Sequence, residues 1–285
     1  MKQIKLTSLS QVRTLLQSNE IRPSKAMGQN FLFDANIIRI ITDAVEPSKK
    51  DAILEVGGGL GVLTEMLVEN AGWLTCVEKD HKLFKILTDR LGTYPNIELK
   101  RADMLELTED CFLNNPPNKF ASNLPYSVGN RILVDIFNWE QPPDTIVVTV
   151  QQDVAERIVA QEGTKDFGIL SIAAQVEYDV HLIKNISPTS FYPAPRVKSS
   201  VLKMTRHNGR NRHRNKPLLM KLLRLAFARR RKQIASLAAE FSDEPYINEN
   251  LNNVFSELGI DLSTRPEQIS AVQWREIVHL LSKPS

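Results

Sequence analysis

Cysteine is scarce in this chain of 285 residues, and long apolar runs are missing. The two cysteines, Cys76 and Cys111, lie far apart and form neither a zinc-binding pattern nor a disulfide framework. The five histidines show no metal-ligand spacing, so we expect no metal site. No segment approaches the roughly 18 apolar residues of a membrane span, and the first residues lack the apolar stretch of a signal peptide. We therefore expect a cytoplasmic protein without a membrane partner.

Acidic residues are absent from one segment of the chain. The net charge is only +3, but Thr205–Lys232 contains eleven Lys and Arg and no Asp or Glu, which leaves −8 for the rest. Such asymmetry favours a surface that faces a polyanion, although a solvated basic face is an alternative. The candidate phosphate contacts are Arg206, Arg210, Arg212, Arg214, Lys221, Arg224, Arg231 and Lys232.

The apolar pattern alternates between short strands and helices, and it then becomes helical. Strands are expected at 52–56, 73–78, 97–101, 119–122 and 145–151, with late strands at 180–186 and 199–204. The alternation predicts a Rossmann-like α/β domain with a mostly parallel sheet and an antiparallel edge hairpin. Helices are expected at 217–241, 246–258 and 266–281. We therefore expect two domains: 1–204, which includes an N-terminal helical arm, and a small all-helical domain at 205–285.

On a helical wheel, the expected helix from Pro217 separates an apolar side from a basic side. Arg230 falls on the apolar side, where an unpaired charge would be costly. We expect Arg230 to be paired with a carboxylate or a carbonyl group at the junction of the two domains. The residues expected to share the apolar side are Leu219, Leu222, Leu223, Ala226, Ile234 and Leu237.

Four successive strands end in residues suited to one small ligand. The first ends in the glycine turn Glu55–Gly61, which fails the G-x-G-x-x-G dinucleotide pattern and carries an acidic residue suited to a cation. Glu78 can accept the hydroxyls of a ribose, and Asp103, with Met104 beside it, can accept the amino group of an adenine. Asn123 ends the fourth strand. The ordered set predicts S-adenosylmethionine, a sulfonium that carries a ribose and an adenine.

The tetrapeptide Asn123-Leu124-Pro125-Tyr126 offers hydrogen-bond acceptors and an aromatic ring that could hold a purine. We expect the Asn123 side-chain oxygen and the Leu124 carbonyl each to accept one N–H of an adenine N6 amine. Pro125 makes the turn rigid, and Tyr126 offers a ring on which the base can stack. Methyl transfer would then depend mainly on positioning. Taken alone, the tetrapeptide is also compatible with a plain polar turn.

Seven motifs in order resemble the small-subunit ribosomal RNA adenine N6,N6-dimethyltransferases of the KsgA type, which are related to the Erm methyltransferases. The resemblance runs from about Ser24 to Lys232. Its motifs are Gly28-Gln-Asn-Phe-Leu32, Glu55–Gly61, Asn123–Tyr126, Val150-Gln-Gln-Asp-Val-Ala-Glu-Arg157, Phe167-Gly-Ile-Leu-Ser171, Phe191-Tyr-Pro-Ala-Pro195 and Ala226-Phe-Ala-Arg-Arg-Arg-Lys232.

The resemblance implies dimethylation of two adjacent adenosines in a hairpin near the 3′ end of small-subunit rRNA, with a role in small-subunit maturation. The immature small ribosomal subunit is the expected partner, and the enzyme is expected to be a monomer. The resemblance further implies that Tyr126 and Phe191 sandwich the target adenine. The implied cofactor contacts are Asn30, Leu32, Gly57, Gly59, Glu78, Asp103, Met104 and Asn123.

Three positions depart from the family pattern. Gly58 replaces a usual Pro, Gly129-Asn130 replaces Ser/Thr-Pro, and Ala26-Met27 precedes Gly28. The first two departures predict a looser glycine turn and a different helix start. The alternatives are an Erm-like large-subunit rRNA methyltransferase and a non-catalytic ribosome-assembly factor that binds RNA. A nicotinamide-dependent oxidoreductase and a DNA adenine methyltransferase fit the motifs less well.

Overall fold

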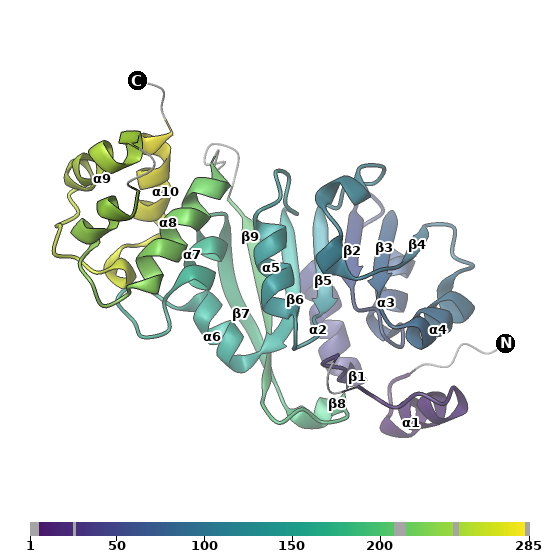
Figure 1. Ribbon diagram of the computed structural model, residues 1–285. Coiled ribbons are helices and arrows are strands. Elements are labelled where there is room, and N and C mark those ends of the chain that lie inside the picture. Colours follow the sequence, from purple (N-terminus) through teal and green to yellow (C-terminus); the bar gives the residue numbers. More distant parts are fainter. Residues whose placement is uncertain (1–5, 25–26, 208–214, 242–244, 283–285) are drawn as a thin grey trace. The chain divides into compact units, whose positions relative to one another are not determined.

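A computed structural model describes residues 6–24, 27–207, 215–241 and 245–282 (Figure 1). The chain forms two compact units: a sheet unit, Met1–Ala155 with His181–Thr205, and a helical unit, Glu156–Val180 with Arg206–Ser285. One junction, at Thr205, lies close to the expected division. The segment Glu156–Val180, which the sequence placed in the first domain, belongs to the helical unit because its helix α7 (Ile169–Gln175) packs against α8 (Lys216–Ala228) and α10 (Ala271–Leu281).

The sheet has seven strands in the order β4-β3-β2-β5-β6-β9-β7. The pairs β2–β3, β3–β4, β2–β5 and β5–β6 are parallel, and β9 runs antiparallel to β6, so the expected fold class is confirmed. The strands are β2 (Ala52–Val56), β3 (Trp73–Glu78), β4 (Ile97–Arg101), β5 (Lys119–Asn123), β6 (Thr145–Gln151), β7 (Tyr178–Ile186) and β9 (Ser199–Arg206). A second, two-stranded sheet pairs β1 (Phe31–Leu32) with β8 (Phe191–Tyr192).

Helices cover both faces of the sheet, with α5 in front and α2 and α3 behind in Figure 1. Local capping sets where two of the helices begin. The Asp34 carboxylate accepts the N–H groups of Asn36 and Ile37, and Asp80 does the same for Lys82 and Leu83. The helices of this unit are α1 (Leu9–Ser18), α2 (Ala35–Val45), α3 (Val62–Asn70), α4 (His81–Leu91) and α5 (Gly129–Phe137), with short 3-10 turns η1 (Met104–Glu106), η2 (Glu109–Phe112) and η3 (Pro188–Ser190). Helix α6 (Gln152–Val159) follows β6.

The helical unit departs from the expected helices in two places. The expected helix 217–241 ends at Ala228 and resumes as η4 (Ile234–Phe241), because the N–H groups of Ile234 and Ala235 donate to the carbonyls of Thr264 and Leu262 instead. The expected helix 266–281 divides into η5 (Pro266–Gln268) and α10, which Ser270 caps. Helix α9 is Pro245–Glu257. None of the described helices is long and apolar enough to cross a membrane.

Side-chain burial in the helical unit follows the helical wheel. The residues expected on the apolar side are all buried, and they pack in a unit whose core includes Trp274, Phe241 and Phe255. Arg230 lies with its Nε 3.7 Å from Glu267 Oε2, and it donates to the carbonyl of Thr164 at 3.1 Å. The expected pairing of Arg230 is therefore confirmed.

The glycine turn after β2 is held by backbone hydrogen bonds and by packing on Cys76. The N–H of Gly57 donates to the Val77 carbonyl at 2.8 Å, and the N–H of Gly61 donates to the Gly58 carbonyl at 2.8 Å. A Cβ atom on Gly58 would lie 2.4 Å from the sulfur of buried Cys76 and 3.0 Å from Leu87 Cδ1. Glycine stands at position 58 because Cys76 fills the space beneath the turn, and the family's proline would collide with it.

We predict that Gly58→Ala lowers the free energy of unfolding by about 1–3 kcal/mol, the usual result of overpacking a filled core. In a Cys76→Ala background the sulfur is gone, so the same substitution will cost at least ~1 kcal/mol less. Urea unfolding of the two single variants and the double variant measures this coupling. Additive effects would contradict the packing relation between Gly58 and Cys76.

Candidate functional site

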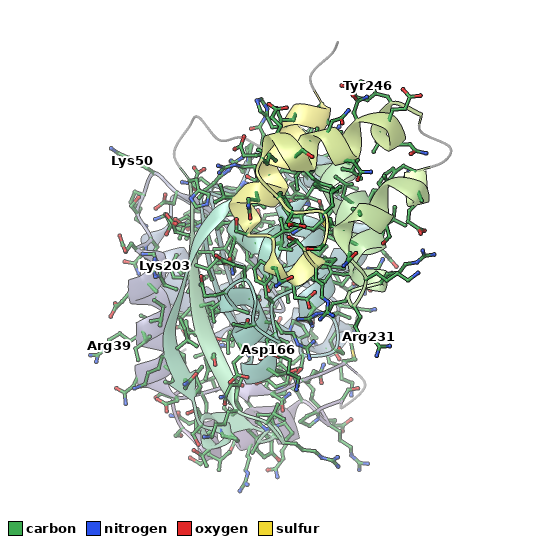
Figure 2. All side chains as sticks on the ribbon, turned by 90° about the vertical axis from the view of Figure 1, so that its left-hand side faces the viewer. Arg39, Lys50, Asp166, Lys203, Arg231 and Tyr246 are labelled. Atoms are coloured by element: carbon green, nitrogen blue, oxygen red, sulfur yellow. The ribbon has the colours of Figure 1, made fainter. Side chains whose placement is uncertain are left out.

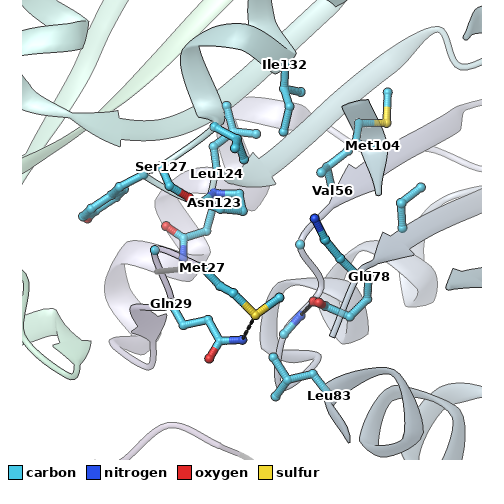
Figure 3. Close-up of a pocket in the computed structure, with 18 of the residues that line it drawn as sticks. Met27, Gln29, Val56, Glu78, Leu83, Met104, Asn123, Leu124, Ser127 and Ile132 are labelled. Carbon is cyan, nitrogen blue, oxygen red and sulfur yellow. Dashed lines mark hydrogen bonds between the residues drawn. The ribbon is translucent and has the colours of Figure 1, made fainter. Parts of the chain in front are cut away.

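A cavity lies where β2, β3, β4 and β5 end, at the carboxyl edge of the sheet (Figure 3). It has about 950 Å³ of empty space and is open to solvent. Parallel strands present their carboxyl ends at one edge, so residues distant in sequence meet there. The sequence-predicted residues that line this cavity are Asn30, Gly57, Gly59, Glu78, Asp103, Met104, Asn123, Leu124, Pro125 and Tyr126.

Glu78 and the glycine turn form one wall of the cavity. The backbone N–H of Gly59 donates to Glu78 Oε2 at 2.9 Å, and the N–H of Asp80 donates to Oε1 at 2.8 Å. Burial raises the pKa of the Glu78 carboxyl, and these backbone donors oppose that rise. Gly57 and Gly59 have φ of +76° and +58°, which bring bare backbone to the cavity. Each carboxylate oxygen keeps acceptor capacity for a hydroxyl group.

Asp103 and Met104 lie at the next strand end. Asp103 Oδ1 accepts the N–H of Leu105 at 3.1 Å, and Oδ2 lies 2.6 Å from the ammonium of Lys79. The hydrogen bond from Lys79 lowers the pKa of Asp103, so this carboxylate is charged at neutral pH. Met104 is buried and lines the cavity, where its thioether can pack on a flat ring.

Asn123 holds the N-terminal arm against the site through one end of its side chain. Its Nδ2 donates to the carbonyl of Asn30 at 3.1 Å, and this partner can only accept, so the amide orientation is fixed. The amide oxygen, Oδ1, is buried and has no hydrogen-bond partner among the described residues. Gly28 of the same arm comes so close to the Tyr126–Ser127 backbone that a Cβ atom would lie 2.9 Å from each of the two amide nitrogens. The arm therefore packs directly on the turn after β5.

The turn Leu124–Val128 is fixed by its backbone. The N–H of Leu124 donates to the Thr149 carbonyl at 3.2 Å, and the Pro125 carbonyl accepts from Val128 at 3.2 Å and from Gly129 at 2.9 Å. Helix α5 starts at Gly129 without a side-chain cap, and Gly129 is packed so closely that a Cβ atom would lie 3.1 Å from that of Leu124. Helix α5 therefore begins at Gly129 itself, the first of the two positions at which the sequence departs from the family pattern.

Phe191 does not line the cavity. In the β1–β8 ladder it is opposite Leu32, and its side chain is 2% exposed within a core cluster that includes Ile38 and Ile41. Its neighbour Tyr192 is only partly buried, because side chains alternate along a strand. The structure therefore brings Tyr126 to the cavity and places Phe191 in the core, and the expected sandwich of the target adenine stays a prediction. Leu32 likewise lines an adjoining small cavity and not this one.

Several lining residues were missed from the sequence. Gln29 closes one side of the cavity, where its Nε2 donates to Asp80 Oδ2 at 3.2 Å. Its place inside the motif 28–32 was the signal that could have identified it. Lys79, the partner of Asp103, follows Glu78 directly. The remaining walls are apolar and were not distinguishable from core: Phe31, Val56, Val77, Leu83, Val128 and Ile132.

Glu55 lies beneath the glycine turn and lines the adjoining cavity. The side chain is 2% exposed, and its Oε2 has no hydrogen-bond partner among the described residues. Burial raises the pKa of Glu55 to about 7, while Thr64 and Cys76 lower it and the charge of Glu78 raises it. A carboxyl group in this state gains a proton easily, and it would be stabilised in its charged form by a cationic ligand.

This pKa makes stability depend on pH. In the unfolded chain Glu55 has its ordinary value of 4.5, so between pH 4.5 and 7 the folded state holds a proton that the unfolded state has lost. The contribution of Glu55 to stability is therefore complete below pH 4.5 and falls as the pH rises to about 7. We predict that Glu55→Gln gains about 2 kcal/mol relative to the wild type between pH 5.5 and 7.5. Urea unfolding at both pH values tests this, and a pH-independent difference would contradict it.

Comparison with known proteins agrees with this geometry. The family described as "Ribosomal RNA adenine dimethylase" matches residues 21–283. A protein of Lachnoclostridium phytofermentans named "Ribosomal RNA small subunit methyltransferase A" is 33% identical over 91% of this chain and 91% of its own length. A protein of the same name from Alkaliphilus oremlandii is 32% identical over 98% of this chain and 99% of its own.

Solved structures share the fold. A dimethyladenosine transferase from Plasmodium falciparum superposes with a TM-score of 0.75 at 20% identity, over 87% of this chain and 95% of that one. The 23S rRNA methyltransferase ErmE superposes with a TM-score of 0.63 at 22% identity, over 89% of this chain and 100% of that one. The match of the family over nearly the whole sequence shows that the chain belongs to the ribosomal RNA adenine dimethylase family.

Proposed function

We propose that the protein is an S-adenosylmethionine-dependent rRNA adenine N6,N6-dimethyltransferase. Its substrate is a pair of adjacent adenosines in a hairpin near the 3′ end of small-subunit rRNA. The observation that carries the proposal is the unpartnered Oδ1 of Asn123, a buried acceptor at the end of the fourth strand. A buried acceptor without a partner is costly, so such an atom signals a missing donor.

The cavity residues fit the cofactor. Glu78 accepts the ribose hydroxyls, Asp103 and Met104 hold the adenine, and the backbone of Gly57 and Gly59 admits the methionine part at close range. Two carboxylates, Glu78 and Asp103, line the wall, and Glu55 lies beneath the glycine turn in the adjoining cavity, which favours a cationic ligand over a pyrophosphate. When bound, S-adenosylmethionine supplies an electrophilic methyl group on a sulfonium.

Asn123 and Leu124 orient the target amine. The N6 nitrogen of adenine is a poor nucleophile because its lone pair is delocalised into the ring. Asn123 Oδ1 accepts one N–H and the Leu124 carbonyl accepts the other, which favours a pyramidal nitrogen with a directed lone pair. The reaction then needs positioning more than a strong base, since the methylated ammonium is acidic and loses its proton readily. Stacking on Tyr126 offsets part of the cost of removing the base from its stack.

Basic residues of the helical unit divide into paired and unpaired sets. The side chain of Arg206 is only 10% exposed and forms an ion pair with buried Glu177. We therefore leave Arg206 out of the proposed RNA-binding surface. Arg229 pairs with Glu240, and Lys221 lies over the ring of Phe241 at 5.4 Å. Arg210, Arg212 and Arg214 lie outside the described residues.

The unpaired set forms a basic recess. Arg231, Lys232 and Arg265 line it together with Ser236, Ser263 and Gln268, and none of the three cations has an ion pair within the ranges that the structure describes. Figure 2 shows Arg231 projecting from the surface. Exposed Arg224 is also unpaired there. Free cations around hydroxyl and amide groups suit RNA phosphates, so we propose that this recess binds the rRNA backbone.

The relatives are named for the small ribosomal subunit, and we propose that this chain acts on the immature small subunit as a cytoplasmic monomer. Labelled S-adenosylmethionine with immature small subunits, large subunits or DNA tests the proposal when the modified base is mapped. Dimethyladenosine at two adjacent positions of the small-subunit RNA is expected. Label in the large subunit alone would favour the Erm-like alternative, and label in neither RNA would contradict the proposal.

Replacing Asn123 by Ala should reduce methyl transfer by about 100-fold or more, because the acceptor that orients the amine is lost. The loss of its bond to Asn30 costs only about 1 kcal/mol of stability. Asn114→Ala, an exposed asparagine of the same unit, is the matched control. Transfer is measured with small subunits, and folding by urea unfolding. Near-wild-type turnover of a folded Asn123→Ala protein would refute the role.

The combined substitution of Arg231, Lys232 and Arg265 by Ala should weaken binding to small-subunit RNA and flatten its salt dependence. Each lost phosphate contact lowers the slope of log affinity against log salt by about 0.7–0.9. The combined substitution of exposed Arg39, Lys50 and Lys85 by Ala removes the same charge from the sheet unit and is the matched control. An unchanged slope in the recess variant would exclude the recess from the RNA interface.

A further inference from the structure

Ser199 is a buried hydroxyl residue that the proposed reaction does not yet use. It is the first residue of β9 and is 0% exposed. In the sheet it is opposite Gln151, the last residue of β6, and the N–H of Gln152 donates to the Lys198 carbonyl at 2.9 Å just before it. The sheet therefore holds the Ser199 side chain at a fixed place, independently of the turn that follows β5.

The Ser199 hydroxyl is hydrogen-bonded to the hydroxyl of Tyr126. The backbone end of Tyr126 is held by the rigid Pro125 turn and by the N-terminal arm at Gly28. The far end of the ring is held by Ser199, so both ends of this cavity-lining ring are fixed. Burial raises the pKa of Tyr126, which keeps its hydroxyl protonated at neutral pH. Without Ser199, this largely buried hydroxyl would lose the partner that keeps the outer end of the ring from swinging within the cavity.

We propose that Ser199 is a positioning residue that holds the outer end of the Tyr126 ring in place and thereby governs the second methyl transfer to each adenine. The inference rests on the proposed function. In the first transfer, two N–H groups meet two acceptors, Asn123 Oδ1 and the Leu124 carbonyl, and these bonds orient the base. After one methyl group is attached, a single N–H remains. The orientation of the base then depends more on stacking, so a ring free to tilt impairs the second step more than the first.

The test compares Ser199→Ala, Tyr126→Phe and the double variant, all assayed on small subunits that lack the modification. The ratio of N6-methyladenosine to dimethyladenosine is followed over time by mass spectrometry of the nucleosides. We expect the first step to change less than threefold and the second to slow about tenfold, the effect of losing one buried hydrogen bond. The double variant should match either single variant, because both remove the same bond.

Two controls separate positioning from stability. Ser200→Ala removes an equally buried hydroxyl of the same strand, which is bonded to Asn185 at 2.8 Å, and it should leave the product ratio unchanged. Ser199→Thr keeps a hydroxyl and should restore the second step. The dissociation constant for S-adenosylmethionine, measured by calorimetry without RNA, should be the same for Ser199→Ala and the wild type.

The outcomes distinguish the two claims. If the wild type forms no methylated adenosine in small-subunit RNA, the proposed function fails, and this inference fails with it. If the wild type dimethylates and Ser199→Ala gives the wild-type product ratio, or slows both steps equally, only the role of Ser199 is refuted. Equal effects of Ser199→Ala and Ser200→Ala would also refute it, because they would indicate a loss of sheet stability.

Discussion

The hydrogen bond from Asn123 Nδ2 to the Asn30 carbonyl is the constraint on which the site depends. It joins the end of β5 to the N-terminal arm, and it turns the amide so that Oδ1 stays without a partner. Because a carbonyl can only accept, the amide cannot be reversed without losing the bond. One interaction thus joins two parts of the cavity wall and leaves an unpartnered acceptor at the end of β5. The close approach of Gly28 to the following turn holds the same two segments together.

Two buried residues beneath the glycine turn, Cys76 and Glu55, determine its packing and its charge. Cys76 fills the space that a side chain at position 58 would need, so the turn gains its order from a neighbour and not from a proline. Glu55 lies in the same layer with a raised pKa and an unpartnered oxygen. Such a group reduces the stability of the free protein at neutral pH. A cation bound nearby would stabilise the charged form of Glu55. Ligand binding would then raise the stability that this buried carboxylate lowers in the free protein.

In the helical unit, pairing decides which basic residues can meet a polyanion. The segment 205–232 has basic residues and no acidic ones. In the structure, however, Arg206, Arg229 and Arg230 form ion pairs with Glu177, Glu240 and Glu267, which all lie outside this segment. Arg231 and Lys232 remain unpaired and meet Arg265 from a different segment. Among the described residues, three unpaired cations thus gather in this recess, while exposed Arg224 lies outside it. The net charge of the segment alone could not indicate this.

The sequence by itself determined the positions of the strands, the mostly parallel class of the sheet and the polar residues at the four strand ends, because periodicity and turn residues are local signals. It also placed Arg230 in a pair. Only the tertiary structure decided which core each segment joins: helix α7 belongs to the helical unit, and Phe191 packs in the core of the sheet unit. No sequence motif indicated a role for Arg265 or Ser199, because their partners lie far away in sequence. Long-range packing and pairing brought these residues to their sites, and no local pattern encodes such contacts.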